Sequence, residues 1–166
     1  MKSLYLVRHA KSDWSDHGIE DYDRPLNERG LRDAPFMAKL LKEKISSVDL
    51  IISSPAKRAF STASYFADSF EIGSKNIIKD EKLYLSGYQS ALKIIQKIKN
   101  MNNNVIIFFH NPDITELASL LSGRYIDNVP TCGIVGLKLL VEKWSEINIK
   151  KCELELFEVP KKYFKE

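Results

Sequence analysis

Two arginines and two histidines follow apolar segments of the chain in a pattern that suits phosphoryl chemistry. Arg8 and His9 come directly after the apolar run at residues 4–7. His110 directly follows a second run, and Arg58 comes shortly after a third. A neutral imidazole can attack phosphorus, and a guanidinium binds phosphoryl oxygens through its planar fork of N–H donors. If the fold brings the four side chains together, they form a pocket for a phosphoryl group.

The elements that must position these side chains are strands and helices in alternation. Apolar runs rich in strand formers predict strands, and apolar residues at every third or fourth position predict helices. Besides the first run, the expected strands cover residues 48–52, 76–79 and 105–109. The expected helices cover residues 28–44, 55–70 and 89–99 and a stretch that ends near residue 121. Two further runs, at residues 133–141 and 152–159, have no helix between them and predict an antiparallel hairpin.

This order of elements favours an α/β fold. We expect a three-layer α/β/α sandwich with a mostly parallel central sheet of about six strands and an antiparallel C-terminal extension. The carboxyl ends of neighbouring parallel strands lie at one edge of a sheet, where open α/β sheets bind ligands. Arg8, His9 and His110 should converge there. Arg58 should lie in the first turn of its helix, where backbone N–H groups and the helix dipole also favour an anion.

Single residues lead to four local expectations. Asn27 is a suitable N-cap for the helix over residues 28–44. Pro35 lies inside that helix and cannot donate a backbone hydrogen bond, so we expect a break or a separate first turn near Asp33. Trp144 should cover the end of the C-terminal hairpin. The lysine-rich tail from Pro160 should be frayed or loosely helical.

Composition excludes several classes of protein. The 166 residues fit one domain spanning residues 1–166, and 44% hydrophobic with 28% charged residues is ordinary for a soluble globular protein. A net charge of +3 without a long basic block gives no sign of a nucleic-acid partner. No apolar run is long enough to span a membrane, so we expect a cytoplasmic protein without a membrane partner. Cys132 and Cys152 lack metal or redox spacing and should be reduced structural thiols.

Four motifs carry a resemblance to a known family. Residues 8–12, Arg-His-Ala-Lys-Ser, resemble the first motif of the histidine phosphatase superfamily, with Ala10 where glycine is commoner. Residues 24–30 are similar to its Pro-Leu-Thr/Asn-x-x-Gly element. Residues 53–59, together with Thr62-Ala63, resemble its Ser-Pro-x-x-Arg-Ala-x-x-Thr-Ala element. His110-Asn111-Pro112 resembles the last motif in the version of SixA-like phosphohistidine phosphatases. The resemblance covers nearly the whole chain and implies a phosphoglycerate mutase-like fold.

The resemblance also implies a role for each core residue. His9 would be the nucleophile that becomes phosphorylated, and water would then hydrolyse the phosphohistidine. Arg8, Arg58 and His110 would hold the phosphoryl oxygens, because fixed cationic donors stabilise the charge on a transferring phosphoryl group without a metal or another cofactor. An attacking His9 needs one unprotonated nitrogen, so its other ring nitrogen should donate to a backbone carbonyl. Further substrate contacts are expected from Ser12, Arg24 and Asn111.

A general acid is the least defined part of the expected site. Superfamily members that cleave phosphate esters usually carry an acid after the third strand, which points to Glu81 in the Asp80-Glu81 pair. A solvated loop pair explains the same two residues. Relatives that act on phosphohistidine or other phosphoramidates need such an acid less, because a protonated imidazole is already a good leaving group.

The short connection at residues 70–76 bears on the substrate, because it leaves no room for the lid of the sugar-phosphate members. An open cleft favours a phosphorylated protein side chain, and therefore a SixA-like phosphohistidine phosphatase. A small-molecule phosphomonoesterase or mutase of the same superfamily remains an alternative, as does a phosphate-binding module without turnover. The expected partner is a phosphorylated protein or a small phosphorylated substrate. A monomer is compatible with the sequence, which does not determine the oligomeric state.

Overall fold

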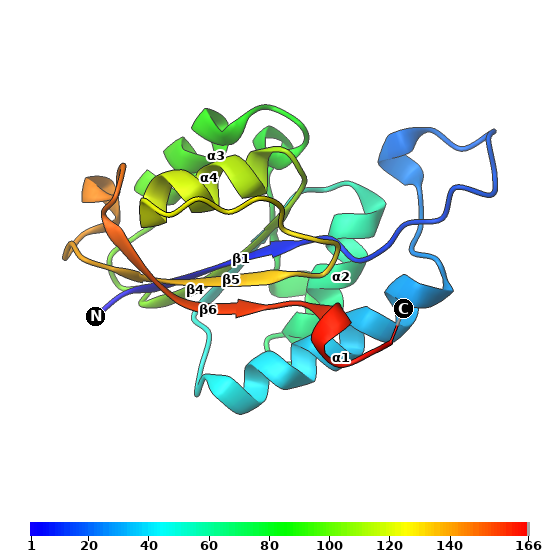
Figure 1. Ribbon diagram of the computed structural model, residues 1–166, viewed down its shortest axis with the longest axis horizontal. Helices are drawn as coiled ribbons and strands as arrows, with labels where there is room; N and C mark the ends of the chain where they lie inside the picture. The colour runs from blue at the N-terminus through cyan, green and yellow to red at the C-terminus, as the bar shows by residue number, and fades with distance from the viewer. Residues whose placement is uncertain (166) are drawn as a thin grey trace.

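A mixed six-stranded sheet forms the middle layer of the protein (Figure 1). The computed structural model describes residues 1–165. Its strands are β1 (Ser3–Arg8), β2 (Leu50–Ser53), β3 (Ile78–Lys79), β4 (Asn104–Phe109), β5 (Ile134–Leu139) and β6 (Cys152–Glu158). Their order across the sheet is β3-β2-β4-β1-β5-β6. The first four strands in this order are parallel, whereas β5 pairs antiparallel with β1, and β6 pairs antiparallel with β5. The predicted α/β fold and the C-terminal hairpin are therefore confirmed.

Helices cover both faces of the sheet. They are α1 (Glu28–Lys44), α2 (Lys57–Ser69), α3 (Tyr88–Gln96) and α4 (Asp113–Ser122). One-turn 3₁₀ helices lie at Asp21–Asp23, Ser74–Asn76, Glu81–Leu83, Trp144–Glu146 and Pro160–Lys162. α1 and α2 pack on one face, and α3 and α4 on the other (Figure 1). None of the helices within residues 1–165 is both long and apolar enough to cross a membrane.

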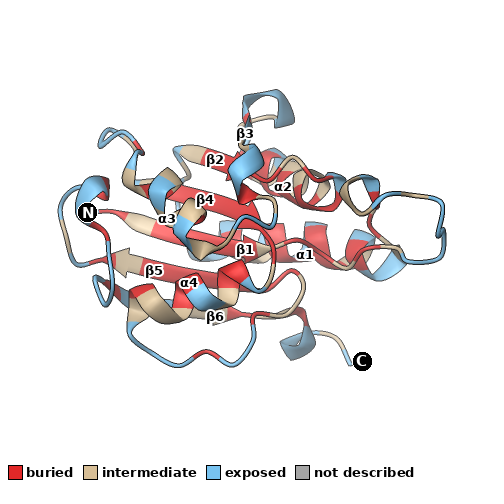
Figure 2. Ribbon diagram, turned by 90° about the horizontal axis from the view of Figure 1, so that it is seen from above, coloured by how far each residue is buried: buried red, intermediate tan, exposed pale blue. Residues whose placement is uncertain are grey.

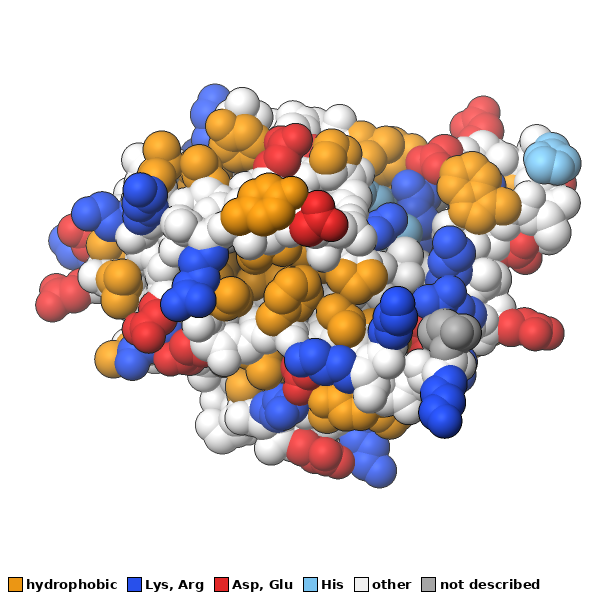
Figure 3. Space-filling model, viewed as in Figure 1, with side chains coloured by type: hydrophobic (Ala, Val, Ile, Leu, Met, Phe, Trp, Pro, Cys, Tyr) orange, Lys and Arg blue, Asp and Glu red, His pale blue; other side chains and the backbone are white. Residues whose placement is uncertain are grey.

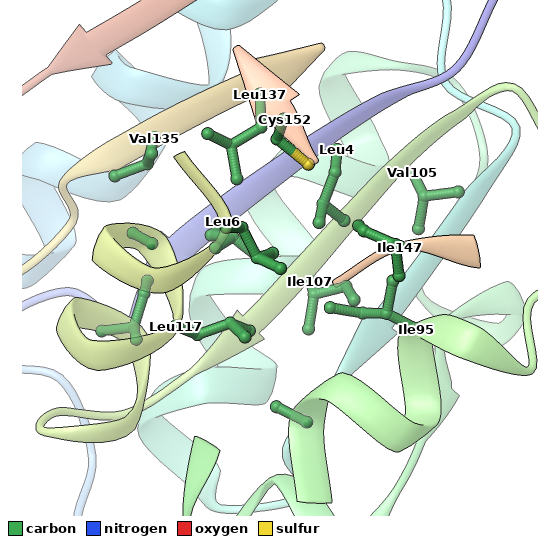
Figure 4. Close-up of a cluster of buried hydrophobic side chains, with 14 of the residues drawn as sticks. Leu4, Leu6, Ile95, Val105, Ile107, Leu117, Val135, Leu137, Ile147 and Cys152 are labelled. Atoms are coloured by element: carbon green, nitrogen blue, oxygen red, sulfur yellow. The ribbon is translucent and has the colours of Figure 1, made fainter. Parts of the chain in front are cut away.

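The central strands are buried on both faces, as strands between two helical layers must be (Figure 2). Successive side chains of a strand point to opposite faces, so β1 supplies both halves of the core. Leu4 and Leu6 belong to the cluster under α3 and α4, part of which Figure 4 shows together with Ile107 and Leu117. Tyr5 and Val7 belong to the cluster over α1 and α2. The sheet edge that carries the candidate site is thus held rigidly.

The expected break in α1 is wrong, because the helix continues from Glu28 to Lys44 with Pro35 inside it. Pro35 removes the hydrogen bond to the carbonyl of Leu31. Both residues lie on the exposed side of the helix, where water can bond to that carbonyl instead. The opposite side is anchored by buried residues such as Met37. The predicted N-cap is confirmed, since the Asn27 side chain accepts a hydrogen bond from the Gly30 N–H.

Two other helices differ from their expected bounds. α2 begins at Lys57 rather than at Pro55, because the Ser54 hydroxyl accepts a hydrogen bond from the Ala56 N–H and stabilises a turn before the helix. α3 ends at Gln96, and the chain turns there so that Ile98 can enter the core.

The C-terminal part is packed more tightly than the sequence suggests. Trp144 lies in the connection between β5 and β6, fully buried, and its indole N–H donates to the Asn102 carbonyl oxygen at 2.7 Å. Its placement over the hairpin connection agrees with the prediction. The tail forms a 3₁₀ turn at Pro160–Lys162 and is anchored by Phe164, whose ring packs against Phe36 of α1 with centroids 4.8 Å apart. The 3₁₀ turn agrees with the loosely helical alternative, and this aromatic contact is the reason that the tail is not frayed there.

Candidate active site

A pocket of about 340 Å³ lies at the carboxyl edge of the sheet. The strands β1, β4 and β2 are parallel neighbours, so the segments that follow them open onto the same edge. In Figure 3 arginine or lysine and histidine side chains are recessed in a hollow beside the projecting loop of residues 11–26. Six predicted site residues line the pocket: Arg8, His9, Ser12, Arg58, His110 and Asn111. The expected convergence at the sheet edge is therefore present in the structure.

His9 is held as a neutral imidazole. Its side chain is buried, and Nδ1 lies 2.7 Å from the carbonyl oxygen of Ala10. A carbonyl oxygen only accepts, so Nδ1 carries the proton and Nε2 is left unprotonated. Burial lowers the pKa of His9 well below its usual value. The neighbouring His110 ring and the charges of Arg58 and Arg8 lower it further, and together these effects outweigh the hydrogen bond to the Ala10 carbonyl, which raises it. An unprotonated Nε2 is the form that an attack on phosphorus requires.

His110 lies against His9, with ring centroids 5.1 Å apart. Its Nε2 is 2.8 Å from the Ser54 hydroxyl, while its Nδ1 is buried without a hydrogen-bond partner. Burial, followed by the charge of Arg58, lowers the pKa of His110 to about 3. A buried nitrogen without a partner is costly unless a ligand supplies one, and a phosphoryl oxygen beside His9 fits that need.

The two arginines supply the cationic part of the pocket. Arg8 donates from Nη1 to the Val129 carbonyl at 3.1 Å, and its Nε is buried without a partner. Arg58, the second residue of α2, donates from Nη1 to the backbone oxygen of Asp21 at 2.6 Å and from Nη2 to its carboxylate at 2.9 Å. These hydrogen bonds fix the orientation of both guanidinium groups.

The segment after α4 holds Arg8 and His9 in place. Cys132 has a left-handed backbone, with φ 59°, and its N–H reaches the carbonyls of both Arg8 and His9 at 3.0 Å. The Arg8 N–H in turn donates to the Gly133 carbonyl at 3.1 Å.

Cys132 and Cys152 are free and buried, which confirms the prediction of structural thiols, and burial raises the pKa of both.

Two predicted residues lie outside the pocket lining. Glu81 is exposed and accepts a hydrogen bond from the Tyr22 hydroxyl at 3.0 Å, so the structure does not bring it to the reacting centre. Arg24 is buried behind the rim, where its guanidinium carbon lies 3.5 Å from the centroid of the Trp14 ring. It therefore braces Trp14 from behind the rim.

Asp21 is the pocket residue whose role the sequence did not indicate. It lines the pocket and contacts Arg58, and its Oδ2 accepts from the Tyr84 hydroxyl at 2.6 Å. Partial burial raises the pKa of Asp21, but hydrogen bonds from Tyr84 and Arg58 outweigh this effect and bring it to about 2. The loop holds several other aspartates, and only the fold distinguishes this one. The further lining residues outside the predicted set are Lys11, Trp14, Leu85 and Thr131.

Comparison with known proteins agrees with this geometry. The model of the histidine phosphatase superfamily (branch 1) matches residues 4–84, the part of the chain that supplies Arg8, His9 and Arg58. A crystal structure from Agrobacterium tumefaciens, assigned as the phosphohistidine phosphatase SixA, is 26% identical and superposes with a TM-score of 0.82 over 96% of this chain and 98% of that one. This chain belongs to the histidine phosphatase superfamily. It resembles the SixA-like branch along nearly its whole length and has the phosphoglycerate mutase-like fold.

Two sequence relatives extend the comparison. An uncharacterised protein of Mycobacterium leprae is 28% identical over 93% of this chain and all of that protein. Phosphoserine phosphatase 1 of Hydrogenobacter thermophilus is 35% identical over 50% of this chain and 38% of its own length. Membership of the histidine phosphatase superfamily supports phosphatase activity for this chain, while of these two relatives only the second has a name that gives a substrate.

Proposed function

We propose that the chain, acting as a single domain over residues 1–166, is a phosphohistidine phosphatase that works through a covalent phosphohistidine on His9. The observation that carries the proposal is the hydrogen bond from His9 Nδ1 to the Ala10 carbonyl, which leaves Nε2 free among cationic donors. In the first step Nε2 attacks phosphorus, and the bond between phosphorus and the leaving atom breaks. Water then attacks the phosphorylated His9, which releases phosphate and restores the neutral imidazole.

The other residues of the site bind the charge that this reaction spreads over three oxygens. Arg8 and Arg58 contribute permanent cations, and the Nδ1 of His110 contributes a further donor if the Ser54 hydroxyl donates to its Nε2. Ser12 and Asn111 line the same pocket and are proposed as further polar contacts. Groups already fixed in a water-poor site stabilise a transition state strongly, because they need not reorganise during the reaction.

The preference for a protein substrate rests on the shape of the site. The connection between α2 and β3 contains only the 3₁₀ turn Ser74–Asn76 and a few flanking residues, so nothing within it covers the pocket. A histidine side chain presented by another protein can therefore reach His9. The structure described as SixA supports the same substrate class.

A small-molecule phosphatase or mutase is the second candidate. The 35% identity to phosphoserine phosphatase 1 over half of the chain favours it, and so does Lys11, a pocket cation that suits a substrate carboxylate. A phosphate-binding module without turnover would retain the pocket but not the reaction.

The test compares a phosphohistidine peptide with phosphoserine and 3-phosphoglycerate as substrates for the same preparation. We expect kcat/KM for the phosphohistidine peptide to be highest by at least about tenfold, since leaving-group protonation and access both favour it. Preferred turnover of phosphoserine or 3-phosphoglycerate would establish the second candidate. Binding of inorganic phosphate without turnover of any of the three would establish the binding module.

A further inference from the structure

The carboxylate of Asp21 has two unlike oxygens. Oδ2 accepts the two short hydrogen bonds, from Arg58 Nη2 at 2.9 Å and from the Tyr84 hydroxyl at 2.6 Å. Oδ1 has one long contact, 3.4 Å from Arg24 Nη2. The Asp21 side chain is 40% exposed, in contrast to 6% for that of Arg58. A carboxylate oxygen has room for two acceptor bonds, so Oδ1 can still accept a hydrogen bond from a ligand.

Asp21 also lies on the side of the pocket that a leaving group would occupy. His9 is 7% exposed and forms the floor, whereas Asp21, Trp14 and Leu85 come from loops at the mouth. In a displacement at phosphorus the leaving atom stands roughly in line with the attacking one, on the opposite side. The leaving group of a substrate attacked by His9 therefore faces these loops.

We propose that the Asp21 carboxylate binds the leaving imidazole of a phosphohistidine substrate through Oδ1 and keeps that ring protonated, so that Asp21 determines specificity for basic nitrogen leaving groups. This inference rests on the proposed function of the site. Asp21 would take the place of a general acid in this pocket, whose lining does not include Glu81.

The charged groups around Asp21 make this role necessary. Arg58 of α2 and Arg24 of the loop face it directly, and Arg8 and Lys11 share the pocket. His110, which directly follows β4, lies close enough for Asp21 to raise its pKa, but burial outweighs this effect and His110 remains neutral at neutral pH. Together the cations oppose protonation of any imidazole that enters. Among the lining residues that the structure describes, Asp21 is the one with an anionic side chain.

Asp21 cannot itself supply the proton. Its hydrogen bonds from Tyr84 and Arg58 outweigh partial burial and bring its pKa to about 2, so it stays a carboxylate at neutral pH. A carboxylate favours the charged form of a neighbouring imidazole, by about one to three pKa units when the two are close. The phosphorylated ring, which titrates near neutral pH, is thereby held in its cationic form.

The step balances without an added acid. The substrate ring enters with phosphorus on one nitrogen and a proton on the other, and is a cation. His9 Nε2 forms a bond to phosphorus as the P–N bond of the substrate breaks, and the electron pair of that bond stays on the departing nitrogen. The product ring leaves neutral with its proton retained, while the phosphorylated His9 ring, which keeps its Nδ1 proton, takes over the positive charge.

The experiment measures kcat/KM against pH for Asp21→Asn and the wild type, with two substrates. One is a phosphohistidine peptide, and the other is 4-nitrophenyl phosphate, whose leaving group departs without a proton. Misalignment of Arg58 in the variant would lower both rates by the same factor, so the ratio of the two kcat/KM values isolates the charge. Asp23→Asn is the matched control, because Asp23 belongs to the same 3₁₀ turn, is exposed and lies outside the pocket lining.

In Asp21→Asn we expect the ratio of phosphohistidine to nitrophenyl phosphate turnover to fall about tenfold at pH 7.5, with the alkaline limb for phosphohistidine moved down by about one pH unit. Asp23→Asn should keep the wild-type ratio and profile. An equal loss on both substrates with an unmoved limb would overturn the role of Asp21 and leave the proposed function standing. A wild type that hydrolyses nitrophenyl phosphate but not the peptide would overturn both.

Discussion

The floor and the mouth of the pocket are built differently. Arg8 is the last residue of β1, His9 and His110 directly follow buried strands, and Arg58 lies in the first turn of α2. All four side chains are at least nine-tenths buried or bound to backbone. The mouth comes from the loop of residues 11–26 and includes the 60%-exposed Trp14. Chemistry that tolerates little misplacement is thus placed on rigid elements, while contacts that select the substrate lie on loops.

Replacing His9, the proposed nucleophile, should give the largest effect and is the most severe test of the pocket floor. His9→Ala is expected to lower kcat by about four orders of magnitude or more, because a unit that acts through one nucleophile loses nearly all its rate with it. Steady-state turnover of a phosphohistidine peptide measures this. The thermal unfolding midpoint of the variant should show that the fold persists, and near-normal turnover would contradict the assignment of His9.

Two arginines, one from each region, allow a matched comparison. Arg58→Ala should lower kcat/KM by about a thousandfold, since it removes a fixed cation from the phosphoryl group. Arg24→Ala leaves that group untouched, but it loosens Trp14 and removes the long contact to Asp21 Oδ1, so we expect a loss of about tenfold or less, mainly in KM. Equal losses in kcat for the two variants would remove the distinction between floor and mouth.

The histidines of the floor should make stability depend on pH. The unfolded chain protonates such a histidine below about pH 6.5, but the folded protein protonates His110 only near pH 3. Between these values the unfolded state binds more protons, so the free energy of unfolding falls as the solution becomes more acidic. Urea unfolding at a series of pH values measures this slope. His110→Asn should flatten it, and an unchanged slope in that variant would show that other groups cause it.

A change in the scaffold away from the pocket should leave turnover almost unaffected. Pro35→Ala restores a backbone donor on the exposed side of α1, and we expect it to raise the free energy of unfolding by about 1 kcal/mol. Denaturant unfolding and turnover are measured on the same preparation. A loss of activity as large as that of Arg24→Ala would mean that a change on the exposed side of α1 alters the geometry of the pocket.

The sequence predicts the floor well because local rules apply there. Apolar runs that end in Arg8-His9 and in His110 place these residues at strand ends, and parallel pairing then brings them together. The mouth is less predictable. Asp21 gains its role from contacts with Arg58, 37 positions away, and Tyr84, 63 positions away, which no local pattern encodes.

Glu81 and Pro35 also show that the local sequence alone does not determine the structure at a position. Glu81 follows β3 as expected, at the start of the 3₁₀ turn Glu81–Leu83, but its orientation toward Tyr22 is decided by the packing of a distant segment. Pro35 has a poor helix propensity that the buried face of α1 overrides. In both cases the tertiary environment decides between outcomes that the local sequence leaves equally open.

The most direct test of the account is to locate the phosphoryl group during turnover. Wild type and His9→Ala are mixed with a phosphoramidate donor, quenched rapidly under conditions that spare acid-labile phosphate, and compared by intact-mass spectrometry and peptide mapping. We predict a transient gain of one phosphoryl group on the wild type alone, located on His9. A phosphoryl group on another residue, or equal labelling of the His9→Ala variant, would contradict covalent catalysis by His9.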